Sequence, residues 1–339
     1  MSRYEVVWLK REGDLVCRLK DFQSEAEVDL IPALGMNVIR YAVREKGVIL
    51  PPPSLTALRQ TPFRYGIPVL CPPGRTRFGR FTYQGISCQL PLNTGMHNVH
   101  GELGTLPWKV ISWGAEEGEG ACLRACYAYR KDPERFAYFP FDLIYTVAYS
   151  LKEGALQLEG CVLNAGDRYA PFSLGYHPYF TCDRSRTSLQ LPASLEWPKA
   201  PRGVGETLPL ATRLAAELHD GADLAGLKES LHYFQCRDNG LERGGAYVCR
   251  LHDKGSGRRI HFQVDGLFSV MVLFLPPWGE AVSLEPHTCI PDAYNLPWDA
   301  SKTGALELAP GEERRFGWRL EVEDREFDEE DRNHESEPN

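Results

Sequence analysis

Four short segments combine titratable side chains with turn residues, a composition that suits a site where protons are moved. Glu285 and His177 stand out, because a carboxylate and an imidazole are the usual general base and general acid near neutral pH. Each is followed directly by a proline, which lacks a backbone N–H and fits poorly inside a central strand. The sequence therefore predicts both groups at strand ends, although each residue taken singly also has an ordinary structural explanation. The four segments are CPPGRTR (71–77), HNVHGELGTLPW (97–108), SLGYHPYF (173–180) and AVSLEPHTCIPDAYN (281–295).

The first two segments supply further candidates for binding. Arg75 follows Pro-Pro-Gly, and a rigid loop of this kind would hold the guanidinium as a fixed fork of donors for oxygen atoms. His97 and His100 are three residues apart and Gly101 follows directly. We expect no metal site here, because a third ligand and the glutamate of a zinc protease motif are both missing. A glycine beside a histidine is more typical of a backbone that a ligand approaches closely.

Strands must position these residues, because the dominant period of the sequence is two. DLIYTVAYSL (142–151) and ALQLEGCVLN (155–164) flank the turn KEG and predict a hairpin. FTYQGISCQL, RRIHFQV, FSVMVLFL and RRFGWRLEV have the same β-rich pattern. The best helical segment is 210–231, expected as two short helices that break near Gly221. With 31 glycines and 25 prolines, many between strands, the sequence predicts an all-β fold: a large antiparallel β-sandwich with a few short helices.

Charge and composition bound the organisation of the chain. Its 339 residues are 43% hydrophobic and 25% charged, which is ordinary for a globular protein. Residues 321–339 hold ten of the 46 acidic residues and two of the 38 basic ones, so this segment carries the whole net charge of −8. We expect one domain over residues 1–320 and an acidic, disordered tail over 321–339. Without a basic patch, nucleic acid is not an expected partner.

Cysteine usage and hydropathy bear on location. The ten cysteines are scattered without a CxxC motif, and a chain of this length has no need of disulfides, so we expect free thiols and no zinc centre. No apolar run approaches the roughly 20 residues that cross a bilayer. The N-terminal segment has no apolar signal core. These features predict a cytoplasmic protein without membrane partners.

The order of the segments resembles that of the aldose 1-epimerase (galactose mutarotase) family over about residues 27–322. This resemblance implies a sandwich with an open sugar cleft on the concave face of one sheet. It also implies that Glu285 is the base, that His177 is the acid, and that His100 and Arg75 bind the sugar, with no cofactor or metal. The matching segments are VDLIPALGMNVIRYAV, PPGRTRFGRF, NVHGELGTLPW, the block from FPFDLIY to YHPYF, SLEPHTCIPDAYN and LAPGEERRFGWRLEV.

Some features stay open under this resemblance. Trp278 in PPWGE is a candidate for stacking on a sugar, or for simple core packing. The family usually places an aspartate in an Asp-His-x-Phe-like segment that binds a sugar hydroxyl. The corresponding residues here are SLHYFQ (230–235), where His232 stands at the aspartate position or one residue from it, so we carry His232 as a substrate-binding candidate.

Three alternatives to a mutarotase remain on the sequence. The first is a carbohydrate-binding protein without catalysis. The second is an epimerase for a sugar phosphate, bound through Arg75, Arg77 and Arg80. A glycoside hydrolase is less favoured, because it needs a second carboxylate as partner of Glu285. The identity of the sugar, and whether the protein is a monomer or a dimer, are also open.

Overall fold

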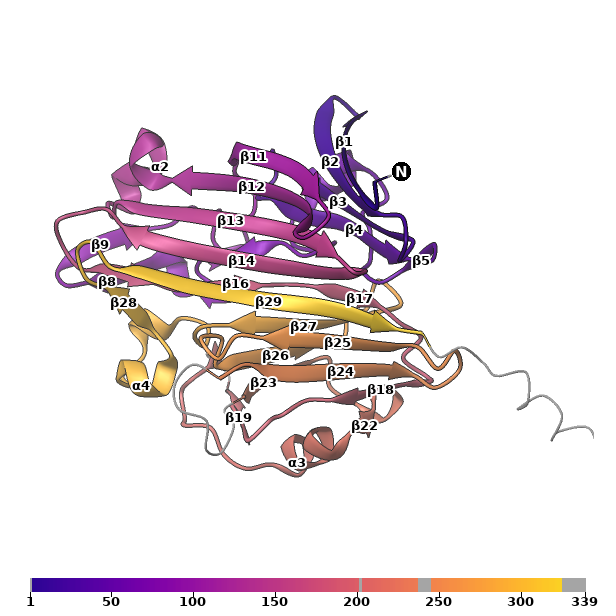
Figure 1. The fold of residues 1–339 in the computed structure, drawn as a ribbon. Coiled ribbons are helices and arrows are strands. Elements are labelled where there is room, and N and C mark those ends of the chain that lie inside the picture. Colours follow the sequence, from indigo (N-terminus) through magenta and orange to yellow (C-terminus); the bar gives the residue numbers. More distant parts are fainter. Residues whose placement is uncertain (1, 201–202, 237–244, 325–339) are drawn as a thin grey trace, which may run out of the picture.

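The structure, a computed structural model that describes residues 2–200, 203–236 and 245–324, is built of antiparallel strands (Figure 1). Its largest sheet has nine strands and forms one layer. In sheet order these strands are β11 (Lys109–Glu116), β12 (Gly120–Ala128), β13 (Leu143–Lys152), β14 (Ala155–Asn164), β29 (Glu313–Glu323), β25 (Arg259–Val264), β24 (Tyr247–Asp253), β18 (Thr187–Gln190) and β22 (Ala222–Asp223).

The opposite layer consists of two sheets. Isolated bridges between Val38 and Ile67 and between Ile49 and Phe180 join them. The five-stranded sheet contains β1 (Tyr4–Arg11), β2 (Asp14–Asp21), β3 (Ala26–Ile31), β4 (Asn37–Val43) and β5 (Lys46–Gly47). The seven-stranded sheet contains β19 (Leu195–Glu196), β23 (Leu231–Gln235), β26 (Val270–Phe274), β27 (Ala281–His287), β16 (Gly175–Tyr176), β6 (Val69–Leu70) and β17 (Tyr179–Thr181).

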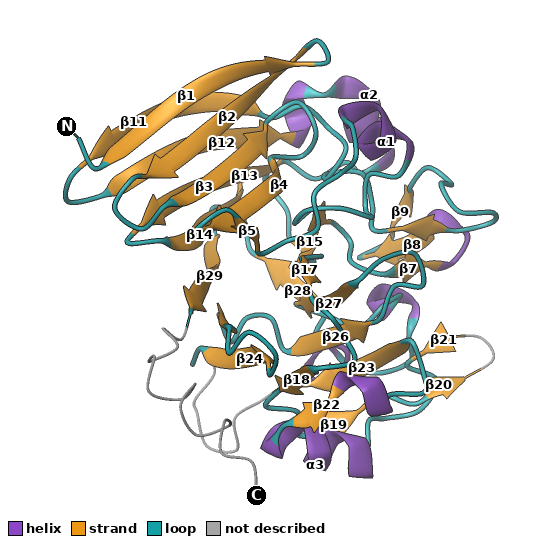
Figure 2. Cartoon of the chain, turned by 90° about the vertical axis from the view of Figure 1, so that its right-hand side faces the viewer, coloured by secondary structure: helices purple, strands orange, loops and turns teal. Residues whose placement is uncertain are grey.

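Large aromatic side chains fill the space between the layers. The rings of Tyr176 and Trp318 lie 5.9 Å apart, and those of Phe180 and Phe262 lie 5.6 Å apart, with all four residues buried. At the other end of the sandwich, β2 contacts β12 and β13 (Figure 2). Burial of apolar surface of this kind is the main favourable term in folding. The predicted all-β fold, a large antiparallel β-sandwich, is confirmed.

Helices are few and short, as predicted. In the segment expected to form two helices, α3 ends at Gly221, whose φ of 106° is unfavourable for other residues. The second expected helix is wrong: β22 follows instead, pairs with β18, and leads into a single 3₁₀ turn. The helical elements are α1 (Leu55–Gln60), α2 (Pro133–Tyr138), α3 (Arg213–Asp220), α4 (Ala300–Thr303), η1 (Arg77–Gly79), η2 (Tyr129–Lys131), η3 (Leu224–Gly226) and η4 (Ala293–Asn295).

Short two-stranded sheets complete the fold. The predicted hairpin of β13 and β14 is confirmed, and so is the pair β8–β9 with its turn at Gln84 and Gly85. The two-stranded sheets are β7 (Arg75–Thr76) with β10 (Asn98–Val99), β8 (Arg80–Tyr83) with β9 (Ile86–Gln89), β15 (Ala170–Phe172) with β28 (Leu306–Leu308), and β20 (Lys199–Ala200) with β21 (Gly203–Val204).

The C-terminal segment is described only in part. Strand β29 continues to Glu323, so the first residues of the acidic segment belong to the nine-stranded sheet. The rest of the predicted tail, residues 325–339, lies outside the described residues. All ten cysteines are free thiols. Among the described residues, every helix is too short or too polar to cross a bilayer.

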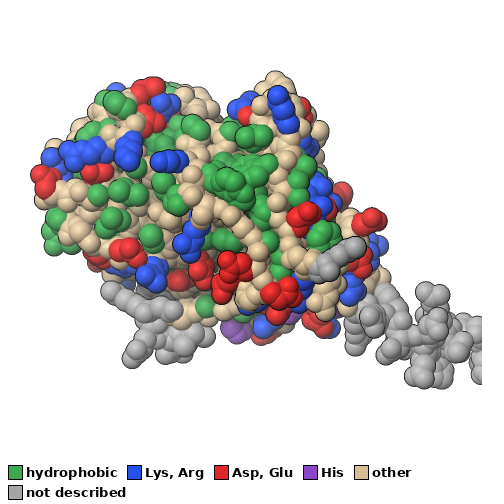
Figure 3. Space-filling view, turned by 45° about the horizontal axis from the view of Figure 1, so that its top comes forward, with side chains coloured by type: hydrophobic (Ala, Val, Ile, Leu, Met, Phe, Trp, Pro, Cys, Tyr) green, Lys and Arg blue, Asp and Glu red, His purple; other side chains and the backbone are tan. Residues whose placement is uncertain are grey.

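The edge strand β11 leaves apolar side chains at the surface. Ile111 and Trp113 are 52% and 57% exposed, and the Trp113 ring contacts Trp8 of β1 edge-on at 5.6 Å. Figure 3 shows hydrophobic side chains gathered on this side of the molecule. Exposed clusters of this kind are often interaction surfaces.

Candidate active site

A cleft of about 380 Å³ lies on one face of the seven-stranded sheet, where three adjacent strands supply its floor. Side chains alternate between the two faces of a strand, so every second residue of β27, β26 and β23 faces the cleft. Glu285 and His287 come from β27, Val272 from β26, and Leu231 and Tyr233 from β23. The carboxyl and imidazole side chains of the cleft floor therefore come from β27, and its more apolar side chains come from β26 and β23.

The two loop segments meet because they form one small sheet. Strand β7 pairs with β10, so that Arg75 lies opposite Val99. The backbone N–H of His100 donates to the carbonyl of Gly74 at 2.8 Å, and the N–H of Cys71 donates to the carbonyl of His100 at 3.2 Å. These bonds hold His100 beside Arg75 at the rim of the cleft. The sequence predicted both residues as candidates, but the pairing that unites them is visible only in the structure.

Position 101 must be a glycine for a reason that the sequence did not reveal. The sequence predicted a close approach by a ligand, but the close neighbour is the protein backbone. A Cβ at position 101 would lie 1.6 Å from the carbonyl oxygen of Cys71, and φ is +65°. His100 is also left-handed, with φ 67°, a strained backbone that functional sites often retain. Gly101 thus allows the histidine loop to press against the arginine loop.

We predict that Gly101→Ala will destabilise the fold by at least about 1–2 kcal/mol, the usual cost of a left-handed non-glycine residue, with the clash adding to it. Gly85→Ala is the matched control, because Gly85 has φ +81° but no atom lies within 4 Å of the place that its Cβ would take. Denaturant unfolding of both variants gives the two free energies. Equal losses for the two variants would contradict a packing role for Gly101.

His177 lies between two short strands that both pair with β27. Gly175 of β16 pairs with His287, and Tyr179 of β17 pairs with Ser283. The sequence His177-Pro178 interrupts the strand between them, as predicted from the proline. The Tyr179 ring stacks on the imidazole at a centroid distance of 4.4 Å. The neighbours Tyr176 and Phe180 instead pack in the sandwich core.

Glu285 is flanked by two histidines in a buried setting. Its Oε1 lies 3.2 Å from Nε2 of His177, and its Oε2 lies 3.2 Å from Nε2 of His287. Burial raises the pKa of the Glu285 carboxyl well above its ordinary value of 4.5. Burial, and then the nearby His100 and His287, lower the pKa of His177 well below 6.5. Both shifts favour an uncharged pair that shares one proton between Glu285 and His177.

His100 acts as a neutral donor. Burial, with a contribution from His287, lowers the pKa of His100 to about 3. The N–H of Gly74 donates to its Nδ1 at 3.2 Å. A neutral imidazole has one acceptor and one donor nitrogen, so Nε2 of His100 carries the proton. The ring lies 5.4 Å from that of His177, and its N–H is available to an oxygen atom of a ligand.

This tautomer argues against a metal centre. His100, His177 and Glu285 offer ligand atoms that all lie within 4.8 Å of one another. A metal bound at Nε2 of His100 would need the lone pair there, which would move the proton to Nδ1 and against the Gly74 N–H. Metal-binding histidines usually show the opposite pattern, with their second nitrogen donating to an acceptor.

The described charges around the cleft are mostly paired. Arg77 forms an ion pair with Asp292, and Lys199 forms one with Glu229. Arg75 is exposed, lines the cleft and has no acidic partner among the described residues. Arg80 bonds to Gln89, on the neighbouring β9. Of the three arginines that the sugar-phosphate alternative would use, Arg75 alone has no side-chain partner in the described part of the chain.

Two predicted binding residues do not line the cleft. His232 is on the opposite face of β23 from Leu231 and Tyr233, where its Nδ1 lies 2.8 Å from Glu196 Oε1 and its ring stacks with Phe234. The expectation that His232 contacts the sugar is therefore dropped: strand alternation turns Leu231, one residue earlier, toward the cleft.

Trp278 is not among the lining residues of the cleft, but its ring contacts that of the lining residue Phe274 at a centroid distance of 5.4 Å. The guanidinium of Arg64 lies 4.7 Å from the Trp278 ring centroid. The tryptophan is 39% exposed, and its contacts make it a support for Phe274 and Tyr179.

Sequence reasoning missed His287 and Tyr233. His287 lies two residues after Glu285 on the same strand and hence on the same face, so the period of two was the signal that could have found it. Burial lowers the pKa of His287 to about 3, so its imidazole is neutral, and its Nε2 lies within hydrogen-bonding distance of Oε2 of Glu285. Tyr233 of β23 lies across from Val272 and lines the cleft.

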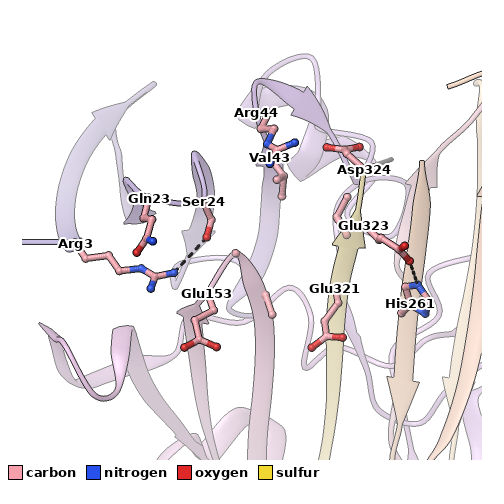
Figure 4. A pocket seen from close by; sticks show the side chains of 13 residues that line it. Arg3, Gln23, Ser24, Val43, Arg44, Glu153, His261, Glu321, Glu323 and Asp324 are labelled. Atoms are coloured by element: carbon pink, nitrogen blue, oxygen red, sulfur yellow. Dashed lines mark hydrogen bonds and ion pairs between the residues drawn. The ribbon is translucent and has the colours of Figure 1, made fainter. Parts of the chain in front are cut away.

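A second cleft, of about 650 Å³, lies where the N-terminal strands meet the end of β29 (Figure 4). Most of its charged groups form ion pairs: Arg3 pairs with Asp21, and His261 lies 3.3 Å from Glu323. Its charged residues are all exposed or only partly buried. It lacks the buried, perturbed acid–base groups that mark catalytic sites, so the cleft at Glu285 is the candidate active site.

Comparison with known proteins places the chain in a family. The model of the aldose 1-epimerase family matches residues 24–321, which is most of the chain. The chain belongs to the aldose 1-epimerase family. A curated relative, the uncharacterized protein YihR of Escherichia coli (strain K12), is 34% identical over 133 residues, or 37% of this chain and 40% of that protein. The chain thus matches only two fifths of that relative's length.

Solved structures share the fold. A galactose mutarotase-like protein from Clostridium acetobutylicum superposes with a TM-score of 0.84 at 22% identity, covering 95% of this chain and 99% of that one. A galactose 1-epimerase from Lactobacillus acidophilus NCFM gives a TM-score of 0.72 at 17% identity, covering 96% and 99%. These likenesses agree with the sandwich architecture that the aldose 1-epimerase family match implies.

Proposed function

We propose that the protein is a mutarotase that interconverts the α and β anomers of a free aldose. The observation that carries this proposal is the buried pair of Glu285 and His177, 3.2 Å apart, in a chain of the aldose 1-epimerase family. Opening a pyranose ring requires removal of the proton from the anomeric hydroxyl and delivery of a proton to the ring oxygen. A pair that shares one proton offers a base and an acid for these transfers.

In this proposal Glu285 takes the proton from the anomeric hydroxyl, and His177 gives one to the ring oxygen. The C1–O5 bond breaks, the anomeric hydroxyl becomes the aldehyde, and rotation about C1–C2 exposes its other face. Closure reverses both proton transfers, so the pair returns to its starting state without a cofactor. Each positioned acid or base typically contributes about 10²–10⁴-fold. His100 and Arg75 donate to sugar oxygens and hold the ring in place.

The charge of the cleft favours an uncharged sugar over a sugar phosphate. A phosphate needs several cationic donors, and of the three arginine and lysine residues that line the cleft, Arg75 alone has no acidic partner among the described residues. A carbohydrate-binding protein without catalysis is the second candidate, since it would need the same cleft. Binding without catalysis would not require a buried acid–base pair, and strongly shifted pKa values of this kind are typical of catalytic sites.

Polarimetry on freshly dissolved single anomers tests the proposal. We predict that the protein accelerates anomerisation of at least one free aldose in a panel that includes glucose and galactose, and does so better than for the corresponding 6-phosphates. The rate should persist after dialysis against a chelator, because no metal takes part. Binding of a sugar without acceleration would support the carbohydrate-binding alternative, and a preference for phosphates would support the sugar-phosphate epimerase.

A further inference from the structure

The two ring nitrogens of His177 face the hydroxyl groups of Ser283 and Tyr179, and each of these hydroxyls donates its proton to a backbone carbonyl. Nδ1 lies 2.7 Å from Oγ of Ser283, and that hydroxyl also lies 2.8 Å from the carbonyl oxygen of Pro178. A carbonyl only accepts, and a serine hydroxyl has one proton to give. The Ser283 proton therefore goes to Pro178, and its oxygen must accept from His177. Ser283 and His177 are both buried, so water does not replace this partner.

Tyr179 has no proton to offer the other nitrogen. Its hydroxyl donates to the carbonyl of Phe63 at 2.8 Å, while lying 3.1 Å from Nε2 of His177. Nε2 also lies 3.2 Å from Oε1 of Glu285. The Tyr179 oxygen could also accept from an Nε2–H, but it lies farther away, at 3.1 Å, than the Ser283 oxygen lies from Nδ1, at 2.7 Å. The carboxyl group of Glu285 can supply a proton to Nε2, whereas the Ser283 oxygen can only accept at Nδ1. Neutral His177 therefore carries its proton on Nδ1, and the lone pair of Nε2 points at the carboxyl group. If Glu285 were ionised at the same time, two acceptors would face each other.

We propose that Ser283 is a positioning residue that makes the Glu285–His177 pair retain its shared proton. Ser283 fixes the tautomer of His177 in which Nδ1 carries the proton. Nε2 of His177 and Oε1 of an ionised Glu285 are then both acceptors, so one additional proton binds between them. The proton then lies on the line between the future acid and base, at the atom that must protonate the ring oxygen. This inference rests on the proposed function for its activity readout, and on geometry alone for its tautomer.

Without the serine the pair can lose that proton more easily. In Ser283→Ala the neutral imidazole is released to carry its proton on Nε2, where it would satisfy an ionised Glu285. The fully deprotonated pair is then stabilised, and the alkaline limb of the rate profile moves to lower pH. The other groups that face this pair are His287 on β27, His100 on its loop, and the rings of Tyr179 and Phe274, and none of them changes in the variant.

The experiment compares pH–rate profiles of the full chain and three variants. Ser283→Ala should lower kcat about tenfold or more, the range for losing a hydrogen bond to a charged group, with little change in KM and an alkaline limb shifted down. Ser283→Thr keeps the hydroxyl, so its alkaline limb should lie at the same pH as that of the wild type. Ser269→Ala is the matched control, because its hydroxyl also donates to a backbone carbonyl, that of Thr288 at 3.2 Å, and forms no hydrogen bond with a histidine among the described residues.

A second measurement does not depend on activity. Nitrogen-15 NMR of imidazole-labelled protein, with the His177 signals assigned through His177→Asn, should show protonated Nδ1 in the wild type. An Nε2–H tautomer for neutral His177, or a Ser283→Ala profile that coincides with the wild type, would overturn the inference. If no sugar is anomerised by the wild type, the proposed function fails, whereas the tautomer remains decided by the NMR result.

Discussion

Glu285→Gln should lower the rate of anomerisation by about 10²-fold or more, the range for losing one acid–base group. Glutamine keeps the size of the side chain and can still pair with His177 and His287, but it cannot take a proton from the anomeric hydroxyl. Binding of the sugar should largely survive, so kcat should fall far more than KM rises. Polarimetry gives the rate, and calorimetric titration with the preferred sugar gives the affinity.

Glu196→Gln is a matched control for this substitution. Glu196 also pairs with a buried histidine, His232, at 2.8 Å, but on the face of β23 that is turned away from the cleft. The control should keep a rate close to that of the wild type. A near-normal rate for Glu285→Gln would place the base elsewhere and would remove the basis of the proposed mechanism.

His177→Asn should reduce the rate to a similar extent, because it removes the proton donor to the ring oxygen while keeping a polar side chain. His232→Asn is its control, since it also removes a buried imidazole but leaves the cleft intact. The double variant Glu285→Gln/His177→Asn should be little worse than either single variant, because both residues serve one step and act as a unit. Losses that multiply would show that the two groups act independently.

The wild-type pH profile should be bell-shaped. On the acid side, activity is lost when the Glu285–His177 pair takes up a second proton. Burial lowers the pKa of His177, so this acid limb lies well below pH 6.5. On the alkaline side, activity is lost when the proton shared by Glu285 and His177 dissociates. Burial raises the pKa of Glu285, so this alkaline limb lies well above pH 4.5. Both limbs belong to the pair rather than to either residue, and in His177→Asn the bell should collapse to a single limb.

The period of two and the glycine and proline punctuation were enough to predict the sandwich and its main hairpins. The four polar segments made Glu285, His177, His100 and Arg75 candidates, and their roles came from the family resemblance. These features are local. Alternation indicates which residues share a face, and the proline after His177 indicates where a strand is interrupted. The prediction that Glu285 also lies at a strand end is wrong, because β27 continues through Pro286 to His287 and stays paired with β26. The expected helix after Gly221 was wrong for the complementary reason, because pairing of β22 with β18 overrode a local preference.

Only the tertiary structure decided which polar residues meet. His177 and Glu285 lie far apart in the sequence and become neighbours because β16 and β17 both pair with β27. The same strand register turns Leu231 and Tyr233 into the cleft and His232 out of it. Proton positions depend on carbonyl groups of Pro178 and Phe63 that no sequence pattern marks. Alternation along the chain determines which residues share a face of a strand, but the direction of each face and the partners of each proton follow from through-space contacts, which is why the chemistry of the site appears only in the folded chain.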